Sequence, residues 1–122
     1  MTELASPSSA AHRTAVTLPM RDIAALLVEN LGVAMTASIG GVDRKTINRW
    51  VNGRPARSVG EGRLRAAFQV FQLVQAVESA STVRAWFIAM NPQLDDESPA
   101  EAMAAGRHRD VMAAARAFVA GQ

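Results

Sequence analysis

The chain has 122 residues, a formal net charge of +2 at pH 7, 49% hydrophobic residues and no cysteine. This length suits one compact domain or two small subdomains with a modest core. The lack of cysteine excludes a disulfide framework and any metal site with thiolate ligands, and it fits the reducing cytoplasm, where we expect the protein to reside. We find no signal peptide and no apolar run of the roughly 20 residues that a membrane span needs, so we expect no membrane partner.

The charges are distributed unevenly along the chain. Residues 43–65 contain seven basic side chains and only two acidic ones, whereas residues 95–101 contain four acids and no base. A basic middle and an acidic later segment predict two different partner surfaces.

The pattern of apolar residues predicts an all-α protein with about seven helices, because no strand or hairpin signal occurs. Residues 1–18 are rich in Ser, Ala and Thr, and we expect them to form a disordered arm. An amphipathic stripe after Pro19 predicts the first helix, which Gly32 closes. This helix should pack behind the next two.

Residues 33–53 predict a helix-turn-helix. Ala37 is small where two helices must cross closely, and Gly41 follows four residues later, where the chain must turn sharply. Asp43 can then cap the second helix through its carboxylate. The spacing of these residues within 33–53 is typical of a DNA-binding helix-turn-helix. A helical hairpin whose charged face is merely solvated remains an alternative.

The second of these helices, expected at residues 44–52, has two different faces. Ile47, Trp50 and Val51 recur at helical spacing and form its apolar back, and Gly53 ends it. The opposite face carries cations and amides, the groups that read a major groove and bind phosphates. The predicted DNA-binding residues are Arg44, Lys45, Thr46, Asn48, Arg49, Asn52 and Arg54.

A loop at residues 54–60 should lead to the longest helix, expected at residues 61–79. Its apolar stripe is wide, so it predicts either a core helix or a dimer seam, and the sequence does not choose between them. The stripe consists of Leu64, Ala67, Phe68, Val70, Phe71, Leu73, Val74 and Val77.

Three further helices are expected after this one. Ser81 or Thr82 can cap the first, which carries Val83, Trp86, Phe87 and Met90 and ends at Asn91-Pro92. The sequence Ser98-Pro99-Ala100-Glu101 is a capping box with proline at the first helical position, and Gly106 closes that short helix. The last helix should run over residues 108–119.

The order of these features resembles the antitoxins of RES–Xre toxin–antitoxin systems, also called the Xre/MbcA/ParS group. The resemblance lies in a helix-turn-helix, a long helix, Trp86-Phe87 before Asn91-Pro92, then Leu94, Ser98-Pro99 and Gly106. It covers about residues 19–121, and the pattern after residue 80 is its more specific part. After the arm expected at 1–18, it implies an Xre-like part at 19–79 and a toxin-binding part at 80–122.

The resemblance implies an antitoxin that binds its own operator DNA and neutralises a RES-domain toxin that consumes NAD. A homodimer within a toxin–antitoxin hetero-oligomer is expected, and a stand-alone dimeric Xre-like regulator is the alternative. A module that no longer binds DNA is a third reading. The toxin-binding residues that the resemblance implies are Trp86, Arg107, Arg109, Arg116, Phe118, Gly121 and Gln122.

The chain lacks the constellation that an enzyme needs. His108 and Asp110 are too close in sequence to share a helix face, and two histidines without cysteine make no credible metal site. The acidic residues 95–97 lack the spacing of a calcium loop, so a solvated turn before a helix is expected there. We therefore expect no catalytic activity, no metal and no cofactor.

Overall fold

The computed structural model describes residues 10–13, 18–54 and 59–122, and within these segments the chain forms helices and no strand. The all-α prediction is therefore confirmed. The helices are α2 (Met20–Leu31), α3 (Val33–Gly40), α4 (Arg44–Val51), α5 (Val59–Gln75), α6 (Ala80–Ile88), the 3-10 turn η1 (Pro92–Leu94), α7 (Pro99–Ala104) and α8 (His108–Ala120).

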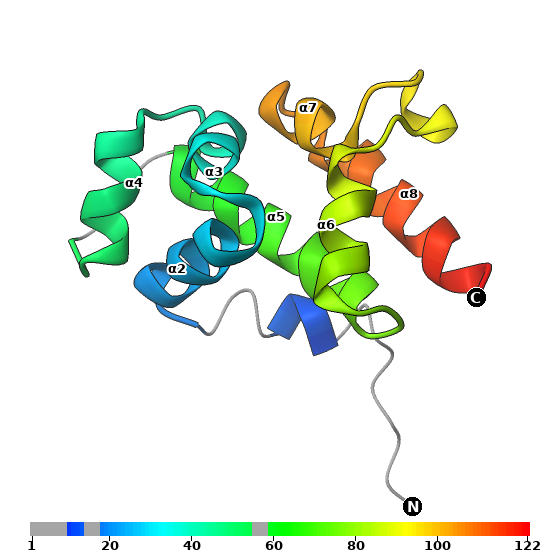
Figure 1. The fold of residues 1–122 in the computed structure, drawn as a ribbon, viewed down its shortest axis with the longest axis horizontal. Coiled ribbons are helices and arrows are strands. Elements are labelled where there is room, and N and C mark those ends of the chain that lie inside the picture. The colour runs from blue at the N-terminus through cyan, green and yellow to red at the C-terminus, as the bar shows by residue number, and fades with distance from the viewer. Residues whose placement is uncertain (1–9, 14–17, 55–58) are drawn as a thin grey trace, which may run out of the picture.

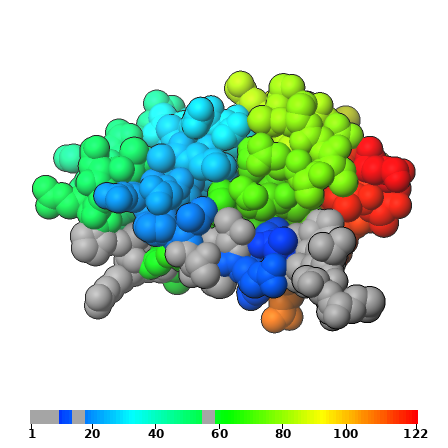
Figure 2. Space-filling view, turned by 90° about the horizontal axis from the view of Figure 1, so that it is seen from below, coloured from blue at the N-terminus to red at the C-terminus, as the bar shows by residue number. Residues whose placement is uncertain are grey.

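Helix α5 crosses the middle of the molecule and connects its two ends (Figure 1). It packs against α2 and α3 on one side and against α6 and α8 on the other. Helix α4 and the C-terminal end of α8 lie at opposite ends, and the perpendicular view agrees (Figure 2). The two candidate surfaces are thus well separated in space.

One hydrophobic cluster runs through the molecule and includes buried residues from both the 19–79 and the 80–122 parts. Phe68, Phe71 and Phe87 are fully buried, and the rings of Phe71 on α5 and Phe87 on α6 have centroids 6.3 Å apart. The stripe predicted on α5 is buried within this single chain, except for Val77, which is 40% exposed. The stripe is therefore core, and it is not left uncovered as a seam for a second copy.

The ends of α5 differ from the predicted range 61–79. The helix begins at Val59 and stops at Gln75. It starts early because Gly60 lets the helix lie directly against Gly40 and Trp50, which a larger residue would prevent. It stops early because residues 76–78 form a turn, in which their N–H groups donate hydrogen bonds to carbonyls of the last helical turn.

The predicted cap of α6 at Ser81 or Thr82 is wrong. Ser79 is the N-cap, and its hydroxyl accepts a hydrogen bond from the Thr82 N–H at 3.4 Å. The helix also ends at Ile88, before the predicted Asn91-Pro92 break. Asn91 instead caps the 3-10 turn, where its side-chain oxygen accepts from the Gln93 N–H at 2.9 Å.

The capping box of α7 is confirmed. The Ser98 hydroxyl accepts from the Glu101 N–H at 3.0 Å, and the Glu101 carboxylate accepts from the Ser98 N–H at 3.2 Å. Ser98 is only 4% exposed, so water cannot readily replace its hydroxyl.

Two serine caps should therefore differ in their importance for stability. Ser98→Ala is expected to lower the free energy of unfolding by about 1–2 kcal/mol, because it removes the buried hydroxyl that pairs with the Glu101 N–H. Ser79→Ala is the matched control, since Ser79 is exposed and its bond is long; we expect a loss of about 0.5 kcal/mol. Urea denaturation measures both, and equal losses would contradict the role assigned to burial.

The N-terminal arm predicted at residues 1–18 lies mostly outside the described residues. Within it, residues 10–13 are helical, Ala11 is 4% exposed, and Leu18 packs against the core. The Leu18 carbonyl also accepts a hydrogen bond from Arg65 at 2.9 Å. In the described segments, no helix has both the length and the apolar character to cross a bilayer.

Candidate functional site

The turn between α3 and α4 is built on Gly41. This residue has φ 67° and ψ 31°, the left-handed conformation that glycine adopts without a steric cost. The Val42 N–H donates a hydrogen bond to the Ala37 carbonyl at 3.1 Å and so closes the end of α3. Ala37 is 5% exposed, as expected for a small residue at a close helix crossing.

Asp43 caps α4 as predicted. Its carboxylate accepts a hydrogen bond from the Thr46 N–H at 2.7 Å. Hydrogen bonds from the Thr46 side chain and backbone, followed by the charges of Arg49 and Lys45, hold the pKa of Asp43 below its ordinary value. The cap therefore favours the ionised carboxylate.

Acidification should reduce the stability that this cap contributes. Because the pKa of Asp43 is lower in the folded state, the unfolded state binds more protons near this pKa, and the contribution of Asp43 to stability rises with pH. This contribution is complete above about pH 5 and is lost as the pH falls through the folded pKa, below about pH 4. Asp43→Asn keeps a capping oxygen without a titrating group.

The test is urea denaturation of the wild type and Asp43→Asn over this pH range. We expect the stability of the wild type relative to the variant to fall on acidification. A difference that does not change with pH would show that the ionisation of Asp43 is not coupled to folding.

The back of α4 is fixed to the core. Ile47 is fully buried and Trp50 is 5% exposed. The tip of the Trp50 indole lies so close to α5 that a Cβ built on Gly60 would be 2.9 Å from its Cη2 atom. Both residues were predicted to form this face, and their burial holds α4 in one orientation.

The front of α4 faces solvent. Arg44, Asn48 and Arg49 are exposed, and Thr46 is partly buried beneath Arg49, whose guanidinium donates to its hydroxyl at 3.3 Å. Gly53, with φ 86°, ends the helix and brings Arg54 beside it. The remaining predicted DNA-binding residues, all exposed, are Lys45, Asn52 and Arg54.

Other basic residues of this region have different positions. Arg21 on α2 lies beside the end of α4, because its Cδ atom would lie 3.8 Å from a Cβ on Gly53; its side chain is 65% exposed and pairs with Asp22 at 3.8 Å. Arg57, the fifth of the seven cations in residues 43–65, lies outside the described residues.

Arg63 and Arg65 are part of the fold. Arg63 donates to the Ala104 carbonyl at 3.2 Å and so ties α5 to the end of α7. Arg65 pairs with Glu61 at 3.3 Å and donates to the Leu18 carbonyl. The described part of the basic segment therefore divides into a solvent-facing set on and just after α4, Arg63, which joins α5 to α7, and Arg65, which joins α5 to the segment before α2.

The predicted partner-binding residues at the other end include an aromatic pair. Trp86 on α6 and Phe118 on α8 are both partly buried, and their ring centroids are 6.2 Å apart. Trp86 also meets the edge of Phe87 at 5.3 Å. Phe87 is buried and Met90 is 77% exposed, which settles which of these two neighbours faces solvent.

Arg107 occupies the centre of an acidic cluster. Its guanidinium donates to Asp110 at 3.1 Å and lies 3.4 Å from Asp95 and 3.7 Å from Glu97. The hydrogen bond with Asp110 raises the pKa of Arg107 above its ordinary value. Arg107 thus joins the acidic turn to α8, an internal role that the sequence pattern did not indicate.

The other predicted partner residues lie along α8 and at its end. Arg109, Arg116, Gly121 and Gln122 are exposed, and the Gln122 amide donates to the Phe118 carbonyl at 3.3 Å. Arg109 and Arg116 line a groove together with His108 and Met112, which were not predicted as site residues. The periodic spacing of His108, Met112 and Arg116 on one helix is the signal that could have indicated them.

In the part of the chain that the structure describes, no three His, Asp or Glu side chains lie close enough together to hold a metal ion. Comparisons with protein-family models, with curated proteins and with solved structures found no match.

Proposed function

We propose that this protein is a cytoplasmic, non-enzymatic antitoxin that binds its operator through α3 and α4 and neutralises a RES-domain toxin through its C-terminal helices. The observation that carries the DNA-binding half is the two-sided α4: Ile47 and Trp50 are buried, while Arg44, Asn48 and Arg49 point to solvent. A helix held in this way can enter a major groove with its polar side chains toward base edges.

Two further features support the reading of α3 and α4 as a DNA-binding helix-turn-helix. The left-handed Gly41 and the Asp43 cap give the connection its tight bend. Helix α4 also lies at one end of the molecule, so a duplex could approach it without meeting α6, α7 or α8 (Figure 1).

The toxin-binding half draws support from the sequence resemblance and from the exposed side chains at the C-terminal end. Partly buried aromatic residues beside arginines are common anchors at protein interfaces, and Trp86 and Phe118 lie close to each other and to the chain end. A dimer on a palindromic operator would need a surface other than the α5 stripe, which is buried.

Two experiments test this proposal. The gene is co-expressed with its neighbouring gene, and rescue of growth from a toxic neighbour is the expected result. Equal survival without this protein would overturn the antitoxin half. A mobility shift on its own promoter tests the DNA half, and absence of any shift would favour an interaction module that does not bind DNA.

The alternative is a stand-alone dimeric regulator. Promoter binding together with a neighbour that is neither toxic nor bound by this protein would support it. The mass of the protein purified with its genomic neighbour distinguishes the two readings directly.

A further inference from the structure

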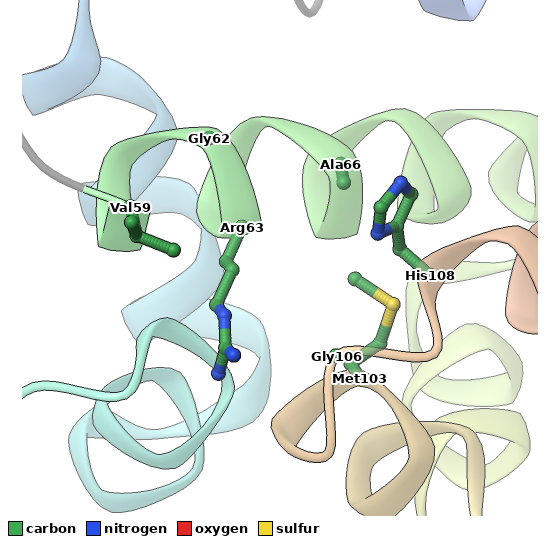
Figure 3. Close-up of a pocket in the computed structure, with 7 residues that line it drawn as sticks. All are labelled: Val59, Gly62, Arg63, Ala66, Met103, Gly106 and His108. Carbon is green, nitrogen blue, oxygen red and sulfur yellow. The ribbon is translucent and has the colours of Figure 1, made fainter.

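An open groove runs between α5 and the start of α8. It consists of two adjoining hollows of about 530 and 320 Å³ that share Ala66 and His108 as wall residues. The first reaches Val59 at the beginning of α5, and the second reaches Arg116 on α8. Figure 3 shows the first hollow, with Ala66 on α5 facing His108 and the Met103 side chain between the helices.

The groove exists because α5 has small residues where it would otherwise fill the space. Gly62 has no atom within 4 Å of where its Cβ would be, and Ala66 follows one turn later. Met103 lines the groove but is only 1% exposed, so the partly buried Met112 supplies its flexible apolar surface, and Val59 is 77% exposed at one end. An unbranched methionine side chain can adapt to the side chains of a partner.

The charge of the groove has one sign. Among the residues that the structure describes, its lining includes the cations Arg63, Arg109 and Arg116 and no acidic side chain. Arg63 turns toward the end of α7, where it donates to the Ala104 carbonyl, whereas Arg109 and Arg116 lie exposed on α8 at the rim. They are seven residues apart on α8, which is two helical turns or about 10 Å.

We propose that this groove binds an acidic amphipathic helix of a partner polypeptide. The apolar face of that helix would cover Ala66 and Met112, and carboxylates two turns apart would pair with Arg109 and Arg116. An open, elongated shape suits a helix laid in a groove, whereas a small molecule needs a site that surrounds most of its surface. The proposal extends the partner-binding half of the proposed function and rests on it for the identity of the polypeptide.

The test measures binding of a synthetic probe to the full chain, without DNA or toxin. The probe is a fluorescein-labelled helix of about 15 residues with leucine along one face and glutamate beside it, and its counterpart carries glutamine in place of every glutamate. By anisotropy we expect the glutamate probe to bind at least about tenfold more tightly than the glutamine probe, because charge pairing adds to apolar contact.

Three variants locate the binding. Arg109→Glu/Arg116→Glu should weaken the glutamate probe at least about tenfold, whereas Arg84→Glu, an exposed arginine on α6 outside the groove, should leave it nearly unchanged. Gly62→Leu should also weaken binding, because its side chain would project into the groove from a position where a Cβ meets no atom within 4 Å. Circular dichroism establishes that each variant is folded.

Several outcomes would overturn the proposal. These are equal binding of both probes, equal loss with Arg84→Glu and the double variant, or no effect of Gly62→Leu. If light scattering shows an oligomer that the double variant converts to monomer, a second copy occupies the groove. Because the probe assay needs neither toxin nor promoter, it can fail while the proposed function holds, and the reverse.

Discussion

Gly60→Ala is expected to lower the free energy of unfolding by about 1–3 kcal/mol, a large effect for a single methyl group. The added Cβ would lie 2.9 Å from the Gly40 carbonyl oxygen, 2.9 Å from Trp50 Cη2 and 3.1 Å from Val42 Cγ1. One of these neighbours is backbone and another is a buried ring, so neither can move without shifting α3 or α4. Thermal and urea denaturation measure the loss.

Gly62→Ala, two residues further along the same helix, is the matched control. Its Cβ meets no atom within 4 Å, so the only effect should be the better helix propensity of alanine, a gain of about 0.5–1 kcal/mol. Opposite signs at the two positions are the expected result. A stabilising Gly60→Ala would mean that α5 does not lie against the turn and Trp50 as described.

The second large effect concerns DNA. If Arg44, Lys45, Arg49 and Arg54 bind phosphates, the slope of log K against log salt should be about −4 per protomer. Replacing Arg44, Lys45 and Arg49 by alanine should reduce the slope to about −1 and weaken binding by about two orders of magnitude near physiological salt. All three side chains are exposed, so the fold should not change.

The control for this variant is Arg84→Ala, which removes an exposed cation from α6, away from α4 (Figure 1). It should leave both the affinity and the slope nearly unchanged. A flat salt response of the wild type would contradict a phosphate-binding surface, and an unchanged slope in the triple variant would place that surface elsewhere.

Local signals in the sequence predicted the α3–α4 region correctly. A glycine at the turn, an aspartate cap and the spacing of Ile47 and Trp50 act within a few residues, so they can be interpreted without knowledge of the rest of the chain. The capping box at Ser98 was predicted for the same reason. Exposure of the polar face of α4 followed, because a helix with one apolar face must turn that face to the core.

The ends of α5 and the cap of α6 were not predicted, because more than one local solution exists there. Ser79, Ser81 and Thr82 can all cap a helix, and where α5 stops decides which of them does so. From the sequence alone, Gly60 is expected to lie in a loop before the helix. It lies inside α5, because the close approach of Gly40 and Trp50 requires a residue without a side chain.

The sequence by itself therefore determined the helical class, the turn before α4 and the division of α4 into an apolar and a basic face, since each depends on periodicity and on neighbours within one or two turns. Only the tertiary structure decided which arginines join distant parts of the chain. Arg63 donates to the Ala104 carbonyl and Arg65 to the Leu18 carbonyl, 41 and 47 residues away, separations that no local pattern encodes. The groove beside α8 likewise exists only because folding places the small residues of α5 opposite the cationic face of another helix.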